Sequence, residues 1–145
     1  MAETLGMLCD KLTIIKLKQY HTEDPEKLKS LGLQALQLQE EIDTYIADAI
    51  NGIIPPEKLV FKANKIFKKE GNEIKKITGD IGKLFSELAD INCRLWHEVE
   101  KGYDIENVPL KEKDNLVKML AVLNLERNEC IDAIDTRFLN LVNKK

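Results

Sequence analysis

The chain has 145 residues, of which 43% are hydrophobic and 32% are charged, and its net charge is −3. This length suits one domain, residues 1–145, with a single hydrophobic core, and is short for two. Acidic and basic residues are interspersed, so the sequence offers no basic face for the phosphate backbone of duplex nucleic acid, and we expect no such partner.

Three segments that place proline ahead of acidic and apolar residues predict where helices begin. In chain order they read TEDPEKL, GIIPPEKL and NVPLKEK. Proline at the first helical position lacks only an N–H that would have no partner there, and acids suit the positive end of the helix dipole. With the other apolar patterns they predict helices at about 2–21, 25–51, 56–69, 73–101 and 109–142, and no strand. The expected fold is an all-α bundle of about five helices, three of them long.

Apolar residues recur every three or four positions in the second and fourth of these segments, as in helices that bury one face. The second carries Leu28, Leu31, Ala35, Leu38, Ile42, Tyr45 and Ala49. The fourth carries Ile74, Ile77, Ile81, Leu84, Leu88, Ile91, Leu95 and Val99. Both stripes are expected in the core, and Gly79 with Gly82 could kink the fourth helix near its start.

The three cysteines, Cys9, Cys93 and Cys130, form no Cys-x-x-Cys pair and lie in apolar helical stretches. This favours small core residues in a reducing compartment over a zinc site or a disulfide framework. No run of about eighteen apolar residues occurs, and the first residues have no basic flank, so we expect neither a membrane span nor a signal peptide. The predicted location is cytoplasmic.

Arg127 occupies a position in the last helix where the core stripe calls for leucine. The stripe runs Leu116, Leu120, Leu123, Arg127, Ile131, Ile134 and Phe138. Asn124, Asp135 and Asn92 lie near the same stripes and could join it in one interior polar cluster. Two interpretations follow: an internal acid such as Asp135 or Glu41 pairs with Arg127 and fixes helix register, or the cluster lines a cavity for an anionic or polar ligand.

Two stretches of the chain place a cation, an aromatic ring and a histidine in the same order. The first has Lys18, Tyr20 and His21, with Lys11 seven positions before Lys18 on the same face. The second has Arg94, Trp96 and His97. Such residues can form a solvated surface whose cations suit the helix dipole. Alternatively, the two motifs converge into one binding surface, and an internal duplication is one way to produce that arrangement.

The segments LCDKLTIIKLKQYHTED and LNLERNECIDAID resemble a loose group of uncharacterised helical proteins, many of them phage-encoded. The group has an Asp-Lys/Arg-Leu-Ser/Thr-Ile opening, a Trp/Tyr-His step and a late Asn-x-x-Arg followed by Ile-Asp. The matching positions are Asp10, Lys11, Leu12, Thr13, Ile14, Tyr20, His21, Asn124, Arg127, Ile131 and Asp132. The match covers the two ends of the chain, and it implies a phage origin and a role in binding host components.

A second resemblance concerns acidic residues. Glu87 and Asp90 in SELADIN form a Glu-x-x-Asp that is similar to the motif of all-α nucleoside triphosphate pyrophosphohydrolases. In that family helical carboxylates hold magnesium for attack of water on a phosphate chain. The family also needs an earlier Glu-Glu-x-x-Glu, for which this chain offers Glu40 and Glu41, followed by Asp43 one position early. A magnesium site at Glu40, Glu41, Glu87 and Asp90 is therefore an alternative.

Taken together, these residues favour binding over catalysis. We expect a small anionic ligand such as a nucleotide, no cofactor or metal, and a homo-oligomer, with a protein partner or host-protein inhibition as the alternative. The candidate ligand-binding residues are Arg127, Asn124, Arg94, His97, Trp96, Lys11, Lys18, Tyr20 and His21.

Overall fold

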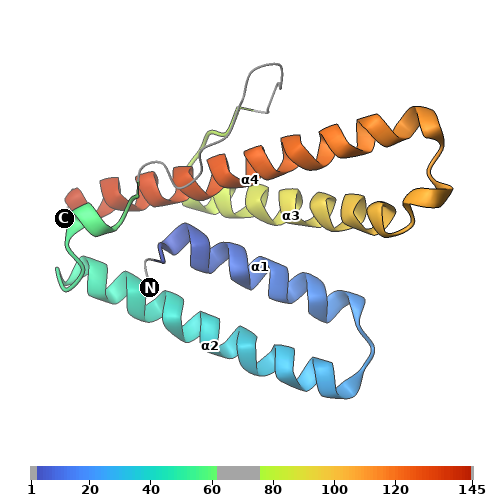
Figure 1. The fold of residues 1–145 in the computed structure, drawn as a ribbon. Coiled ribbons are helices and arrows are strands. Elements are labelled where there is room, and N and C mark those ends of the chain that lie inside the picture. The colour runs from blue at the N-terminus through green and yellow to red at the C-terminus, as the bar shows by residue number, and fades with distance from the viewer. Residues whose placement is uncertain (1–2, 62–75, 145) are drawn as a thin grey trace.

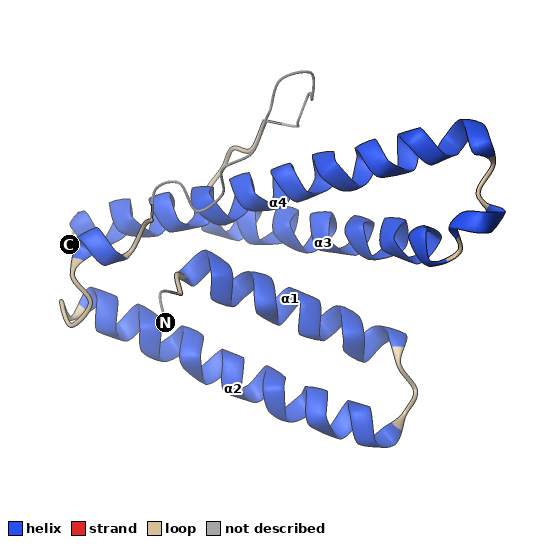
Figure 2. Cartoon of the chain, in the orientation of Figure 1, coloured by secondary structure: helices blue, strands red, loops and turns tan. Residues whose placement is uncertain are grey.

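The computed structural model describes residues 3–61 and 76–144, and within these ranges the chain is helical with no strand (Figure 2). The α-helices are α1 (Leu5–His21), α2 (Pro25–Ile50), α3 (Ile81–Tyr103) and α4 (Leu110–Asn143), and the short 3₁₀ turns are η1 (Pro56–Lys58) and η2 (Ile105–Asn107). The all-α class is confirmed. None of the helices described is both long enough and apolar enough to cross a bilayer.

The four helices form two antiparallel hairpins, α1 with α2 and α3 with α4 (Figure 1). Helix α1 is the central element, because it packs against α2 on one side and against both α3 and α4 on the other. Helix α2 contacts mainly α1 and so has an open outer face.

The predicted starts at Pro25 and Pro109 are confirmed. Asp24 caps α2 by accepting a hydrogen bond from Glu26 N at 3.0 Å, with Pro25 in the first turn. Pro109 directly precedes α4. Each proline has a φ angle suited to a helix start and gives up no hydrogen bond there.

The third and fourth predicted helices differ from the structure. In 56–69, residues 56–58 form only the turn η1, the next three are not helical, and 62–69 lie outside the described residues. The fourth helix begins at Ile81, not at 73, and residues 73–75 lie outside the described part. Gly79 has φ +124°, a conformation that ends any helix, so it precedes α3 and does not kink it. The described chain therefore has four α-helices where about five were expected.

The predicted stripes lie only partly in the core, because Leu28 and Val99 are exposed and Ile74 lies outside the described residues. The main core lies between α1, α3 and α4. Its most buried side chains are Leu84, Leu88, Ile91, Leu123, Cys130 and Ile134. A smaller cluster of Ile15, Leu31 and Ala35 joins α1 to α2. All three cysteines are free; Cys9 and Cys130 are buried core residues as predicted, whereas Cys93 is half-buried.

Candidate functional site

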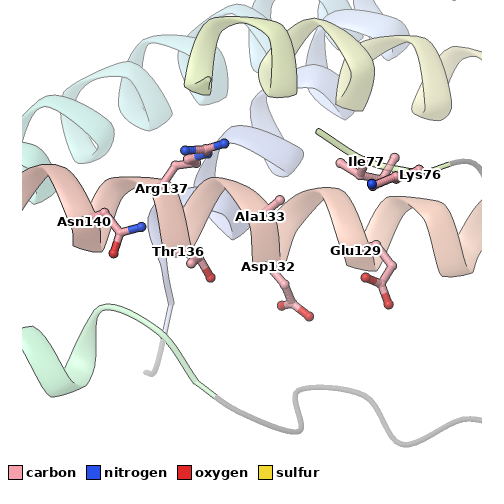
Figure 3. A pocket seen from close by; sticks show the side chains of 8 residues that line it. All are labelled: Lys76, Ile77, Glu129, Asp132, Ala133, Thr136, Arg137 and Asn140. Atoms are coloured by element: carbon pink, nitrogen blue, oxygen red, sulfur yellow. The ribbon is translucent and has the colours of Figure 1, made fainter. Parts of the chain in front are cut away.

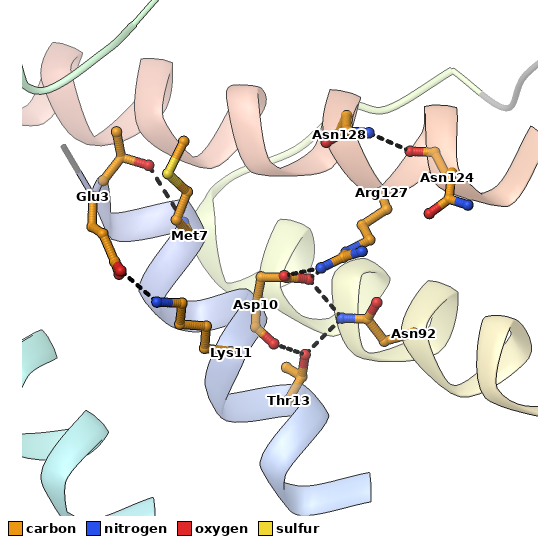
Figure 4. A network of polar contacts seen from close by, with 10 residues as sticks. Glu3, Met7, Asp10, Lys11, Thr13, Asn92, Asn124, Arg127 and Asn128 are labelled. Atoms are coloured by element: carbon orange, nitrogen blue, oxygen red, sulfur yellow. Dashed lines mark hydrogen bonds and ion pairs between the residues drawn. The ribbon is translucent and has the colours of Figure 1, made fainter. Parts of the chain in front are cut away.

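Arg127 on α4 forms an ion pair with Asp10 on α1 (Figure 4). Arg127 Nε donates to Asp10 Oδ1 at 2.8 Å, and Nη2 donates to Oδ2. The Asp10 side chain is 7% exposed and that of Arg127 29%. The hydrogen bonds to Asp10 raise the pKa of Arg127 above its usual value, although burial acts against them. The charge of Arg127 is thus compensated by an internal acid, which is neither Asp135 nor Glu41.

Asn92 and Thr13 extend this ion pair into a network across three helices. Asn92 Nδ2, on α3, donates to Asp10 Oδ1 at 2.9 Å and to Thr13 Oγ1 at 2.7 Å. The Thr13 hydroxyl in turn donates to the backbone oxygen of Asp10 at 2.7 Å. We call Asp10, Thr13, Asn92 and Arg127 the polar network. Because its groups satisfy one another inside the bundle, it fixes how α1, α3 and α4 meet.

The expected interior cluster is only partly present. Arg127 and Asn92 belong to the polar network, but Asn124 donates to Leu120 O of its own helix at 3.1 Å. Asp135 lies two turns beyond Arg127 on α4 and accepts a hydrogen bond from Gly6 N at 2.7 Å. Sequence reasoning did not identify Asp10 as the partner of Arg127, although Asp10 belongs to the motif of the phage group.

Asp135 is the centre of a second buried polar group near the start of α1. It is 1% exposed, and burial raises its pKa to about 6 despite hydrogen bonds from Thr4 and Gly6. Its Oδ2 atom has no hydrogen-bond partner among the described residues. Burial and the charge of Asp135 raise the pKa of both Cys9 and Tyr45 to about 12. The Cys9 thiol and the Tyr45 hydroxyl are therefore neutral at physiological pH, and neither is activated as a nucleophile.

The two cation–aromatic–histidine motifs come together at the end of α1. The His21 ring stacks on Trp96 with centroids 4.7 Å apart, and the His97 ring lies edge-on to it at 6.1 Å. His21 Nδ1 donates to Leu17 O at 2.8 Å, so Nε2 is the nitrogen left to meet a ligand. Tyr20 packs edge-on against His21 and is otherwise exposed. Arg94 is also exposed on α3 and lines none of the cavities around this cluster.

A cavity of about 430 Å³ opens beside His21 between α1 and α2, with Trp96 at one wall. Lys18 and Lys27 line it from the two helices, and no carboxylate belongs to its lining. A second cavity of about 320 Å³ continues along the same helices, shares Lys18 and Gln34 with the first, and includes Lys11 and Glu41. Lys11 is paired with Glu3. We call the two cavities together the α1–α2 groove.

Another cavity, of about 290 Å³, lies between α1, α3 and α4 and is also lined by Trp96. Its walls are mostly apolar, and its polar lining includes Asn92, Asn124 and Arg127. We call it the α1–α3–α4 cavity. Trp96 lines both this cavity and the α1–α2 groove, so the only tryptophan of the chain reports on both sites.

The cavity in Figure 3 is larger, about 580 Å³, and lies along α4 beside Lys76 and Ile77. Its charged lining residues are Lys76, Arg137, Glu129 and Asp132, two of each sign. This balance does not select a ligand of either charge.

The four acids of the magnesium alternative do not form a site. Glu40 and Glu41 lie on α2, whereas Glu87 and Asp90 lie on α3, and α1 packs between the two helices. Across residues 3–61 and 76–144, no three His, Cys, Asp or Glu side chains gather closely enough to hold a metal ion.

Comparison with known proteins adds no relative: no protein-family model, no curated protein and no solved structure matches the chain. Function must therefore be inferred from the α1–α2 groove, the polar network and the α1–α3–α4 cavity.

Proposed function

We propose that this protein binds a small anionic ligand, such as a nucleotide, in the α1–α2 groove and catalyses no reaction. The observation that carries the proposal is the lining of the groove beside His21, where Lys18 and Lys27 face one space with no carboxylate. Neither lysine has an acidic partner among the described residues, whereas Lys11 has Glu3. Two such ammonium groups favour an anion in the space between them.

The rest of the lining suits a phosphate-bearing ligand with a polar ring. Ser30 and Thr22 add hydroxyl donors near the lysines, the amide of Gln34 lines both cavities of the groove, and that of Gln37 lies farther along. Amide side chains offer both a donor and an acceptor, as the edge of a nucleobase requires. A nucleotide would therefore lie along α1 and α2, with phosphate at Lys18 and base toward Gln37.

This location overlaps only in part with the one that the sequence favoured, because Lys11, Lys18, His21 and Trp96 line the groove whereas Arg127 and Asn124 do not. Because Asp10 already neutralises its charge, Arg127 attracts an anionic ligand less strongly than the two lysines do. The three free cysteines support a reducing, cytoplasmic setting for the ligand.

The test is a titration of the purified protein with inorganic phosphate, AMP, ADP and ATP, followed by melting temperature and by Trp96 fluorescence. We expect at least one anion to raise the melting temperature, and the double substitution Lys18→Gln/Lys27→Gln to remove that rise without changing the fold. Lys16→Gln is the matched control, because Lys16 is exposed on α1 but lies outside the groove. If no anion stabilises the wild-type protein, the proposal is wrong.

A protein partner is the second candidate, and the outer face of α2 favours it. Leu33 and Leu36, three positions apart on this face, are 62% and 58% exposed and so form a neighbouring apolar pair. A second copy of the chain could cover them, giving a homo-oligomer, or a host protein could do so. Light scattering on the wild type and on Leu33→Lys/Leu36→Lys distinguishes self-association from a monomer.

A further inference from the structure

The α1–α3–α4 cavity differs in chemistry from the α1–α2 groove. Apolar side chains such as Ile14, Leu17, Leu95 and Val99 form most of its walls. Its volume of about 290 Å³ matches a molecule of roughly ten non-hydrogen atoms, at the lower end of ligand sites.

The polar part of the lining is already organised by the polar network. Arg127 uses Nε and Nη2 on Asp10, which holds the guanidinium plane in place. Its Nη1 atom makes no hydrogen bond among the described residues, so it is a fixed donor on a residue that lines the cavity. Asn124 uses Nδ2 on Leu120 O, which leaves its amide oxygen as an acceptor.

The charge of these groups argues against an anionic occupant. Asp10 neutralises Arg127, so the pair as a whole carries no net charge. Glu100 also lines the cavity, and the His97 ring lies 3.7 Å from its carboxylate. A carboxylate ligand would lose its hydration without gaining a free counter-ion, whereas an uncharged carbonyl oxygen accepts from Arg127 at little cost.

We propose that the α1–α3–α4 cavity binds a small uncharged molecule with an apolar body and one amide group. Its carbonyl oxygen accepts a hydrogen bond from Arg127 Nη1, its N–H donates to the Asn124 oxygen, and its apolar part packs against Leu95, Trp96 and Val99. This site shares no charged residue with the α1–α2 groove and does not depend on the proposed anion binding.

Three probes with the same six-carbon body test this proposal: hexanamide, hexanoate and hexylammonium. Each is titrated into the full-length protein at neutral pH, and binding is followed by Trp96 fluorescence and by melting temperature. We expect hexanamide to give a saturable signal and to bind about tenfold more tightly than hexanoate, since that ion must bury a charge without a free counter-ion. Hexylammonium should also bind more weakly, because the one acid of the lining, Glu100, has a side chain that is 54% exposed, so water screens its attraction.

Two substitutions assign the signal to this cavity. Val99→Phe places a ring into the space from a half-exposed position, and Asn124→Ala removes the amide acceptor from an exposed position. Both variants should fold, as circular dichroism would show, and both should lose most of the hexanamide response. Lys18→Gln/Lys27→Gln should keep it, because both lysines line only the other site.

Three results would overturn the proposal. Hexanoate binding as tightly as hexanamide would mean that Arg127 serves an anion. A hexanamide signal that survives in both folded cavity variants would place the ligand elsewhere, and the absence of any signal would leave the cavity without this ligand. Because the anion titration depends on Lys18 and Lys27, failure of either proposal is distinguishable from failure of the other.

Discussion

Arg127 and Asp10 stand 117 positions apart in the chain and form a two-pronged ion pair that joins α4 to α1. The two members differ in exposure, since the carboxylate is almost fully buried whereas the guanidinium keeps partial access to water. Loss of Arg127 and loss of Asp10 should therefore lower the free energy of unfolding by different amounts.

Arg127→Met is expected to lower the free energy of unfolding by about 2–4 kcal/mol, because it leaves the buried Asp10 carboxylate with Asn92 as its remaining side-chain donor. Asp10→Asn should cost less, about 1–2 kcal/mol, since the freed guanidinium can turn toward water. Urea denaturation of both variants measures the difference. Equal costs, or a larger cost for Asp10→Asn, would contradict this account.

The double variant Asp10→Leu/Arg127→Met provides the control. It removes both charges together and leaves Asn92 bonded to Thr13, so its stability should lie within about 1 kcal/mol of the wild type. A double variant as unstable as Arg127→Met alone would show that the cost comes from lost packing and not from an unpaired charge.

Local signals predicted where helices start better than how far they run. Pro25 and Pro109 each precede a long helix, yet Pro56 begins only a short turn, after which Leu59 is fully buried. A proline in the first turn fixes one φ angle, whereas the length of a helix depends on what its face packs against. Gly79 was misjudged as a kink within the fourth helix, because the sequence shows a glycine but not its φ angle, and φ +124° places Gly79 before α3.

For the candidate site, the anomaly of Arg127 could be predicted but its partner could not. An arginine in a leucine stripe is visible within one helix, whereas pairing with Asp10 depends on how two distant helices pack. Asp10 did not stand out, because α1 is covered by α2 on one side and by α3 and α4 on the other, so its apolar pattern has no single face. The meeting of His21 with Trp96 was anticipated only as a convergence of two motifs.

Gly6 should tolerate no larger side chain. A Cβ atom there would lie 2.5 Å from the backbone oxygen of Ile131, so α1 and α4 would have to move apart. Gly6→Ala is expected to destabilise the protein by about 2–3 kcal/mol. Gly32→Ala is the matched control, since it lies inside α2 with no atom within 4 Å and should stabilise by about 0.5–1 kcal/mol. Thermal melts of both variants provide the test. If the two melting temperatures shift in the same direction relative to the wild type, the close-packing argument is wrong.

The separation of the acids predicts no magnesium-dependent hydrolysis of nucleoside triphosphates. Glu40 and Glu41 lie on α2, and Glu87 and Asp90 on α3, so one ion cannot be shared by all four without repacking α1. Pyrophosphate release from each triphosphate, measured with and without magnesium, should stay at the background rate. Hydrolysis that Glu87→Gln or Asp90→Asn abolishes would reverse this conclusion and make those acids ligands.

Asp135 should make the protein more stable in mild acid than at neutral pH. Its pKa is raised from 3.8 to about 6 in the folded state, because burial disfavours the charged form. Between these two values the folded chain binds more protons than the unfolded chain, so the contribution of Asp135 to the free energy of unfolding falls as pH rises from about 4 to about 6. The fall amounts to about 2–3 kcal/mol.

Asp135→Asn separates this contribution from those of the other acids. The amide keeps an oxygen that can accept a hydrogen bond from Gly6 N but carries no charge at any pH. The variant should therefore be at least as stable as the wild type at pH 7.5. The slope of its free energy of unfolding against pH should lack the contribution of Asp135. Asp43→Asn is the control, because Asp43 is exposed on α2 and its replacement should leave the slope nearly unchanged. Urea denaturation at half-unit steps from pH 4 to pH 8 measures all three proteins. A wild-type slope that persists in Asp135→Asn would show that another group titrates, and a variant far less stable at pH 7.5 would show that the carboxylate is needed in its charged form.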